Sequence, residues 1–375
     1  MKKGVGLFLL AILFVVALFS LQRSSRFYRY ELIDLGEVAN PRNTGICLND
    51  RGDIFYYSIL KGETVQGFFR EPDGAINPFE EVFGQTPVQL TDINNAGRVC
   101  GYVIGATATH RAFVWDTTSG FQFVETPPDS HAYIHDINES GELAGAVSSG
   151  TDKMKPHFWK SATAKGLPLD ASRGWNGYGR RINEMGTVIG GQFNVDNPLN
   201  PMTAAFVWSP TEGIVTPEKL DQLGVALLAI NDRGDLFGQF GPLGDSFVWT
   251  RSSGVKKIPP IGRAILVPWD FNNRGQAIGV YNESNPSGFR DLLRRILSLP
   301  WIDRFTGPIV NWLDATGNGG FLYEEGETIP LEDQVGGASK WDVVSPMRIN
   351  DPGQIVGIGL KRGVHHFFLL EPVRK

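Results

Sequence analysis

The chain has 375 residues, with 35 Lys and Arg against 40 Asp and Glu, which gives a formal net charge of −5. This balance argues against a general nucleic-acid binder, because such a protein needs a basic surface to displace counterions from phosphates. Hydrophobic residues make up 42% and charged residues 20%, so the chain can form a packed core and is not disordered. The 45 glycines are spread along the chain and indicate many turns.

The first 26 residues have the pattern of an export segment. Lys2 and Lys3 precede an uncharged run over residues 4–21, and Arg23 and Arg26 follow it. A helix of this length reaches about 27 Å, just enough to cross a thin bilayer. A small-x-small cleavage site is missing, so an uncleaved signal anchor is favoured over a cleaved signal peptide. We therefore expect a hydrophobic N-terminal helix that places the body, residues 27–375, outside the cytoplasm, anchored at the membrane or secreted after cleavage.

One pattern recurs seven times along the body. An apolar residue is followed by Asn, two variable residues and Gly, and six of the copies have a second Gly four residues later, whereas the first copy has Tyr56 there. The repeated residues are Asn49, Asn94, Asn138, Asn183, Asn231, Asn272 and Asn350. Their spacings are 45, 44, 45, 48, 41 and 78 residues. A period near 45 is the length of one four-stranded propeller blade, about 40–45 residues.

The physics of one repeat predicts four antiparallel strands. The Asn side chain can bind the backbone two residues on, and the Gly suits the left-handed position that closes a hairpin loop with a bulge. In the second repeat, the segment Phe113-Val114-Trp115 places both rings on one face of a third strand. Residues 121–124 then form a fourth strand. We expect these aromatic rings, Trp115 among them, to be buried between neighbouring blades.

The ends of the body indicate how the ring closes. The last repeat stops after its third strand, near residue 370, and a strand-like segment over residues 28–35 precedes the first repeat. That segment can complete the last blade and so remove the exposed edges that an open ring would leave. The sequence therefore predicts an all-β protein, a seven-bladed β-propeller whose N-terminal strand closes the last blade.

The 78-residue step predicts an insertion in blade 6, at about residues 285–318, although a degenerate eighth blade is an alternative. Apolar residues recur at helical spacing within the insertion, and Pro300 ends that pattern. One interpretation is an amphipathic helix that contacts a partner or the lipid surface. The other is a helix that caps its own propeller. The contact residues of the first interpretation are Phe289, Leu293, Arg294, Ile296, Leu297 and Trp301.

A second repeated position, the residue before the apolar-Asn pair, is usually charged. A position that recurs in every blade lies at the same radius in each, so these charges are expected near the axis. They could form a ligand-binding ring, or they could pair with one another between blades, which their mixed signs favour. The charged residues are Asp92, Asp136, Arg181, Asp270 and Arg348, and the exceptions are Cys47 and Ala229.

Catalytic and cofactor motifs are missing from the sequence. It has no phosphate loop, dinucleotide fingerprint, zinc-binding helix motif or serine elbow, and its six histidines are scattered over different repeats. We therefore predict no cofactor, no metal site and no catalytic residue. Two cysteines, Cys47 and Cys100, exclude a disulfide-dense scaffold but leave a single bridge open.

The repeat, Ile-Asn-x-x-Gly-x-x-x-Gly followed by a segment that ends in Phe-x-Trp, resembles the bacterial extracellular repeats named for His-Ala-Phe. The resemblance covers about residues 27–372. In one repeat Arg111-Ala112-Phe113 keeps two residues of the three-residue core. The resemblance implies export and a propeller-like body, and it carries no agreed catalytic residues.

These patterns favour an exported, membrane-anchored binding or scaffold module for a partner protein or a cell-surface ligand such as a glycan. The alternative is a propeller hydrolase or lyase that acts on glycan through the charged residues of the central funnel. A third possibility is a surface repeat with a purely structural role.

Overall fold

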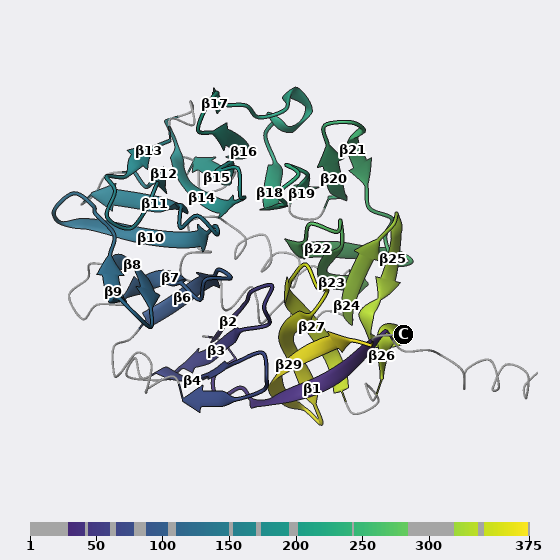
Figure 1. Cartoon of the computed structure of the whole chain (residues 1–375). Coiled ribbons are helices and arrows are strands. Elements are labelled where there is room, and N and C mark those ends of the chain that lie inside the picture. Colours follow the sequence, from purple (N-terminus) through teal and green to yellow (C-terminus); the bar gives the residue numbers. More distant parts are fainter. Residues whose placement is uncertain are drawn as a thin grey trace, which may run out of the picture.

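The computed structural model describes residues 29–41, 44–60, 65–78, 88–103, 110–149, 153–169, 174–194, 202–241, 244–283, 319–336 and 341–373. Seven β-sheets surround a common axis, so the predicted seven-bladed β-propeller is confirmed (Figure 1). The predicted helices at residues 1–26 and 285–318 lie outside the described residues. The same holds for Phe289, Leu293, Arg294, Ile296, Leu297 and Trp301. No helix within the described ranges is long and apolar enough to span a membrane.

Blades 1 to 4 each contain four consecutive antiparallel strands. Blade 1 consists of β2 (Thr44–Leu48), β3 (Ile54–Ile59), β4 (Val65–Arg70) and β5 (Ile76–Pro78). Blade 2 consists of β6 (Val88–Ile93), β7 (Val99–Val103), β8 (Arg111–Asp116) and β9 (Gly120–Phe123). Blade 3 consists of β10 (Ser130–Ile137), β11 (Leu143–Ser149), β12 (Lys155–Trp159) and β13 (Leu167–Pro168). Blade 4 consists of β14 (Asn176–Ile182), β15 (Val188–Asn194), β16 (Met202–Ser209) and β17 (Gly213–Ile214).

Blades 5 to 7 continue the order, and two short 3-10 helices accompany them. Blade 5 consists of β18 (Val225–Ile230), β19 (Leu236–Phe240), β20 (Ser246–Thr250) and β21 (Gly254–Lys257), preceded by η1 (Glu218–Leu220). Blade 6 consists of β22 (Ala264–Phe271), β23 (Ala277–Glu283), β24 (Gly319–Glu324) and β25 (Glu327–Pro330). It is followed by η2 (Leu331–Gln334) and β26 (Val335–Gly336). Blade 7 consists of β27 (Trp341–Ile349), β28 (Ile355–Lys361), β29 (Val364–Pro372) and β1 (Tyr30–Glu37).

The N-terminal strand closes the ring as predicted. Strand β1 pairs antiparallel with β29, with Tyr30 opposite Pro372, and its other edge pairs parallel with the two residues of β26. On β1 the carboxylate of Asp34 accepts hydrogen bonds from the Lys361 ammonium and from Nδ1 of His366, the latter at 2.9 Å. The first and last described segments of the chain are therefore held together by both a ladder and charged side chains.

The chain resumes blade 6 after the long step between the sixth and seventh repeats. Strands β23 and β24 pair antiparallel, with Tyr281 opposite Gly319, although 35 residues separate them in sequence. The structure therefore has seven blades, and the alternative of an eighth is wrong.

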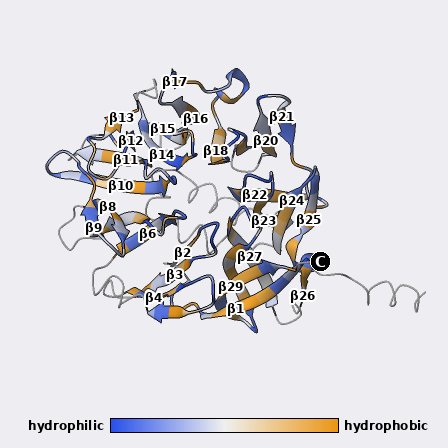
Figure 2. Ribbon diagram, in the orientation of Figure 1, coloured by the Kyte–Doolittle hydropathy of each residue, from blue (hydrophilic) through white to orange (hydrophobic). Residues whose placement is uncertain are grey.

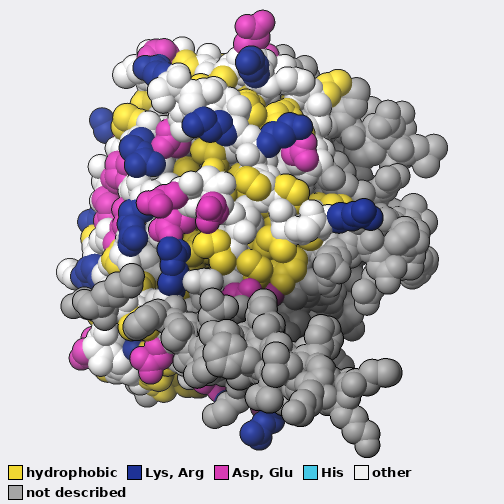
Figure 3. Space-filling view, turned by 90° about the vertical axis from the view of Figure 1, so that its right-hand side faces the viewer, with side chains coloured by type: hydrophobic (Ala, Val, Ile, Leu, Met, Phe, Trp, Pro, Cys, Tyr) yellow, Lys and Arg dark blue, Asp and Glu magenta, His cyan; other side chains and the backbone are white. Residues whose placement is uncertain are grey.

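The core lies between neighbouring blades. Figure 2 shows hydrophobic residues along the strands of each blade and hydrophilic residues in many of the turns. Trp159 is fully buried between blades 2 and 3, and its indole N–H donates to the carbonyl of Glu125 at 3.1 Å. Trp115 packs against the core between blades 1 and 2, where we expected it, but it is only partly buried. On the rim shown in Figure 3, hydrophobic side chains are grouped beside acidic and basic ones.

The repeated turn has the structure that its residues predict. In blade 1 the side-chain Oδ1 of Asn49 accepts the backbone N–H groups of Arg51 at 3.1 Å and Asp53 at 2.9 Å. The glycine of this turn, Gly52, has a φ of +89°, and the corresponding glycine has a positive φ in all seven repeats. Glycine adopts this left-handed conformation without the steric cost that a Cβ imposes.

The second glycine of the repeat marks the position of a β-bulge. In six blades it lies opposite an extra residue in the innermost strand, so the bulge is in that strand rather than at the hairpin loop. In blade 3 a Cβ on Gly145 would lie 2.0 Å from the carbonyl oxygen of Tyr133. Blade 1 has Tyr56 instead of this glycine, and its β2–β3 ladder has no register shift.

Candidate functional site

The innermost strands of the seven blades surround the axis and bring the five predicted charges together (Figure 1). Each of these side chains has a hydrogen bond or an electrostatic interaction with a residue from another blade. We call this group the axial charge cluster. It consists of Asp92, Asp136, Arg181, Asp270 and Arg348.

Asp136 joins three blades. Its Oδ2 accepts the backbone N–H of Ile182 at 2.7 Å, its Oδ1 lies 3.9 Å from Nη1 of Arg181, and its carboxyl interacts electrostatically with that of Asp92. Burial, with the neighbouring Asp136, raises the pKa of Asp92 well above its usual value. Burial also raises the pKa of Asp136, although Arg181 opposes this.

The two arginines of the cluster reach past small residues. Nη2 of Arg348 in blade 7 donates to the carbonyl of Thr91 in blade 2 at 3.4 Å, and the intervening blade 1 has Cys47 at this position. Arg181 in blade 4 interacts with Asp270 in blade 6, and the intervening blade 5 has Ala229. Burial alone would lower the pKa of Arg181, but the three aspartates of the cluster outweigh it and raise that pKa.

Asp270 repeats the backbone contact of Asp136, because its Oδ2 accepts the N–H of Ile349 in the next blade at 3.0 Å. The charges of the cluster therefore pair with one another, which was one of the two interpretations of the sequence. They are not sealed from water, since 14% of the Arg181 side chain and 10% of the Asp136 side chain are exposed. Mutual pairing and access for a ligand are thus compatible at this position.

The bulges add a second set of axial side chains that the sequence analysis missed. Oγ1 of Thr91 donates to the carbonyl of Ile134 at 2.9 Å, and Nδ1 of His135 donates to that of Gly179 at 2.7 Å. Nε of Arg180 likewise donates to a carbonyl of the next blade, that of Leu228, at 3.2 Å. Burial lowers the pKa of His135 to about 4, so its ring is neutral near pH 7. The sequence does contain a signal for these side chains, because the second glycine, present in six of the seven repeats, marks the bulge.

The remaining bulge residues are apolar. We call the six residues at this position the bulge layer. Leu228 and Met347 cannot form the polar contact, and the buried Nε1 of Trp269 has no hydrogen-bond partner among the described residues. The members of the bulge layer are Thr91, His135, Arg180, Leu228, Trp269 and Met347.

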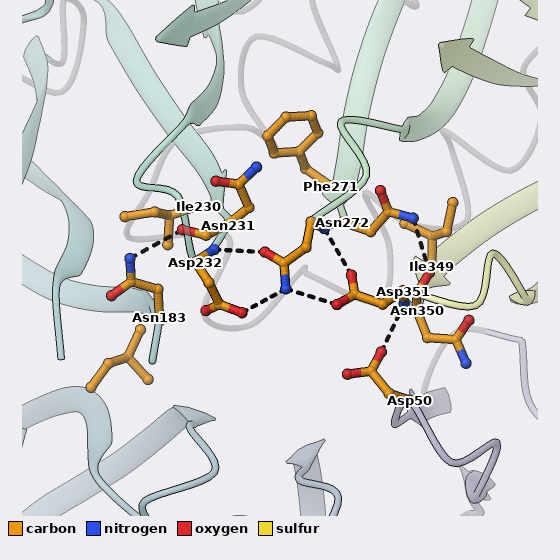
Figure 4. Close-up of a pocket in the computed structure, with 12 residues that line it drawn as sticks. Asp50, Asn183, Ile230, Asn231, Asp232, Phe271, Asn272, Ile349, Asn350 and Asp351 are labelled. Carbon is orange, nitrogen blue, oxygen red and sulfur yellow. Dashed lines mark hydrogen bonds between the residues drawn. The ribbon is translucent and has the colours of Figure 1, made fainter. Parts of the chain in front are cut away.

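At the turn end of the axis, the repeated asparagines form a ring of hydrogen bonds. The Nδ2 of Asn49 donates to the carbonyl of Asn94 at 3.0 Å, and the same bond links each following blade except one. The Nδ2 of Asn231 instead donates within its own turn, to Asp235 at 3.2 Å. Figure 4 shows the part of this ring that surrounds the exception.

The residues that directly follow the asparagines form a second ring of hydrogen bonds. The residue after each Asn accepts the backbone N–H of the equivalent residue in the preceding blade, and all seven of these bonds are present. Parts of both rings line a polar cavity of about 120 Å³ (Figure 4). Burial and the nearby Asp50 and Asp232 raise the pKa of Glu139. The seven residues are Asp50, Asn95, Glu139, Glu184, Asp232, Asn273 and Asp351.

The described part of the chain contains no group of three or more His, Cys, Asp or Glu side chains arranged to hold a metal ion. Cys47 and Cys100 are both buried free thiols, which answers the question of a bridge that the sequence left open. Burial raises the pKa of the Cys47 thiol to about 12, so it is protonated and unreactive near neutral pH.

The comparisons with known proteins show the fold alone. No family model and no curated protein matches the chain. A streptogramin B lyase has 13% identity and a TM-score of 0.50, over 91% of this chain and 98% of that one. Virginiamycin B lyase from Staphylococcus aureus has 14% identity and a TM-score of 0.52, over 92% and 100%. A puromycin hydrolase has 12% identity and a TM-score of 0.52, over 89% of this chain and 50% of its own.

Proposed function

We propose that the chain is an exported binding propeller, held at the outer side of the membrane by residues 1–26, whose axial charge cluster recognises a polar ligand or a polar group of a cell-surface partner. The observation that supports this most strongly is the cluster itself. Charged side chains from five separate blades lie on the axis, pair across the ring and still contact solvent.

The fold does not require these charges. Blades 1 and 5 have Cys47 and Ala229 at the same position, and both still form four-stranded sheets within the ring. Removing charged groups from water costs free energy that pairing only partly offsets. Charges that the blade architecture can omit, at a place where ring-shaped proteins bind small molecules, are better explained by recognition than by stability.

A screen of polar compounds tests this function. The full chain in detergent is scanned for compounds from a panel of sugars, sugar acids and amino acids that raise its melting temperature. Any compound that does so should lose its effect with Arg181→Gln but keep it with Arg233→Gln, since Arg233 is an exposed arginine paired within its own turn. A panel without effect, or equal effects in both variants, would contradict the proposal.

A second function, hydrolysis or elimination on a glycan, is favoured by one specific observation. Asp92 and Asp136 come from neighbouring blades and interact, and burial raises the pKa of each, which is typical of general acid and base pairs. Turnover of a glycan panel by the wild-type chain that is lost in both Asp92→Asn and Asp136→Asn would favour this function. Binding without turnover would favour the first.

Export is tested separately. The full chain is fused at its C-terminus to alkaline phosphatase, which is active only outside the cytoplasm, and compared with a variant that lacks residues 4–21. We expect activity in the membrane fraction for the first fusion and none for the second. Equal activity of the two fusions would contradict export through this segment.

A further inference from the structure

The two faces of the propeller are built differently. On one face, which we call the turn-end face, the first strand of each blade turns into the second, and this connection is five residues long in all seven blades. On the opposite face, which we call the loop face, the second strand turns into the third. These connections range from two residues in blade 7 to 35 in blade 6. Connections of variable length on a rigid scaffold are where binding contacts usually lie, whereas uniform turns close the structure.

The N-terminal strand enters the propeller from the turn-end face. Strand β1 begins with Tyr30 opposite Pro372 and runs towards the loop face, where Glu37 lies opposite His366 (Figure 1). Pro372 is at the turn end, because a Cβ on Gly353, in the repeated turn of blade 7, would lie 3.7 Å from its ring. The chain that precedes β1 therefore arrives at this face.

Polar contacts fix the first described residue to the turn ends. Nη1 of Arg29 donates to Oε2 of Glu324 at 2.6 Å, and Oε1 of that carboxylate accepts Nε2 of Gln276 at 2.6 Å. Gln276 is the last residue of the repeated turn of blade 6. The backbone N–H of Arg29 donates to the carbonyl of Gln334, and its carbonyl accepts the N–H of Val373. Arg29 is thus held beside blades 6 and 7 at the turn-end face.

The chain between this point and the proposed anchor is short. Seven residues, 22–28, separate the apolar run over residues 4–21 from Arg29. They span at most about 25 Å, because an extended chain advances no more than ~3.6 Å per residue. A propeller with its loop face towards the bilayer would use about 23 Å of this reach to pass the seven residues of β28 along the rim. That would leave no space for the 35-residue connection of blade 6.

The charges indicate that the turn-end face is directed at the lipid without lying on it. The seven five-residue turns and the connections between the third and fourth strands of blades 1 to 6 contain 12 Asp and Glu against seven Lys and Arg. Anionic headgroups repel such a surface. Attachment therefore depends on the seven-residue tether and not on direct lipid contact. The acidic side chains include the five of the second ring, Asp50, Glu139, Glu184, Asp232 and Asp351.

We propose that the propeller is oriented with its turn-end face towards the bilayer and its loop face outward, which makes the loop face the surface open to a partner outside the membrane. This inference rests on the proposed function and adds the side from which the molecule is reached. The entry of β1 and the uniform turns belong to one face, and the variable connections belong to the other.

Energy transfer to the membrane tests this orientation. The full chain is reconstituted into lipid vesicles that contain an acceptor dye on their headgroups, and a donor dye is attached to one introduced cysteine at a time. Native Cys47 and Cys100 are buried, so the introduced thiol is the one that reacts. In blade 7 the matched variants are Pro352→Cys at the turn end and Val364→Cys at the loop end. Both positions are exposed, and β28 separates them.

We expect transfer from position 352 to be at least about twofold greater than from position 364, because about 23 Å of strand lies between them. A second pair in blade 5 should show the same order, which would exclude a propeller resting on its rim. It consists of Arg233→Cys at the turn end and Asp245→Cys at the loop end, where 56% and 58% of the native side chains are exposed. Equal transfer within the pairs, opposite orders in the two blades, or greater transfer from the loop ends would contradict the orientation.

The alkaline phosphatase fusions distinguish the two ways in which this inference can fail. If the full-length fusion is active in the membrane fraction but the loop-end labels transfer more strongly, the orientation is wrong and the proposed function stands. If that fusion is inactive and the chain does not stay with the vesicles, the anchor and the orientation fail together.

Discussion

The Asn-turn ring and the axial charge cluster are two layers of the same axis, built by the same strands only two residues apart. The ring has the same residue in all seven blades, and in six of them its side chain forms the same bond to the next blade. The cluster position has Cys, Asp, Arg or Ala, and its contacts differ from blade to blade. A uniform position closes the ring, whereas a position free to vary is available for recognition.

The largest loss of stability is expected at a glycine of the repeat where the neighbouring backbone leaves no room for a side chain. A Cβ on Gly190 would lie 2.1 Å from the carbonyl oxygen of Tyr178, whereas on Gly191 it would have no neighbour nearer than 3.5 Å. We expect Gly190→Ala to lower the free energy of unfolding by about 3 kcal/mol and Gly191→Ala to change it by less than about 1 kcal/mol. Urea unfolding of both variants measures this. Equal losses would mean that the bulge carbonyl does not constrain the site.

The Asn ring provides the next contrast. Nδ2 of Asn138 donates to the carbonyl of Asn183 in the next blade, whereas the side chain of Asn231 bonds, among the described residues, only within its own turn. Asn138→Ala should therefore cost about 1 kcal/mol more than Asn231→Ala, the usual worth of one hydrogen bond. The two unfolding free energies in urea give this difference directly. If Asn231→Ala were the costlier change, the ring would not stabilise the blade interfaces.

The axial charge cluster predicts a dependence on pH. The pKa of Asp92 is raised in the folded chain. Its contribution to the free energy of unfolding is therefore fully present below its pKa in the unfolded chain, about 3.9, and is lost as the pH rises through its pKa in the folded chain. The variant Asp92→Asn does not lose stability in this way, because its amide does not titrate. The stability of the variant relative to wild type should therefore increase from pH 4 to pH 8. A constant difference would contradict the raised pKa.

Asp34 on the closing strand is the control with the opposite sign. Burial would raise its pKa, but Lys361, the N–H of Gly36 and His366 outweigh this and lower it. The contribution of Asp34 to the free energy of unfolding is present above its pKa in the unfolded chain, about 3.9, and is lost as the pH falls through its pKa in the folded chain. Asp34→Asn should therefore reduce stability near neutral pH, and this reduction should disappear at acid pH.

The smallest effect is expected at the exposed turn. Arg233 pairs with Asp235 at 3.0 Å, and 56% of its side chain is exposed. Surface pairs of this kind contribute little, so Arg233→Gln should change the unfolding free energy by less than about 0.5 kcal/mol. A loss above 1 kcal/mol would show that the turns matter beyond the Asn ring.

The repeat made the fold predictable, because an Asn and a Gly at a period near 45 specify the turn and the blade length together. The closing strand followed from an incomplete last repeat. The five charges were also predicted, since a repeated position maps to one radius. Their partners were not, because a single bulge decides whether Thr91 or Asp92 faces the next blade. The effect of Tyr56 on the ladder of blade 1 likewise depends on contacts across strands that the sequence does not encode locally.

The central claim is that charges from separate blades form one coupled site. A double-mutant cycle between Arg181→Gln and Asp270→Asn tests it most directly, because 89 positions and one whole blade separate these residues in the sequence. We expect a coupling of about 1 kcal/mol in urea unfolding, and none for the control pair Arg51→Gln and Asp270→Asn. Effects of Arg181→Gln and Asp270→Asn that add to within about 0.3 kcal/mol would contradict the claim.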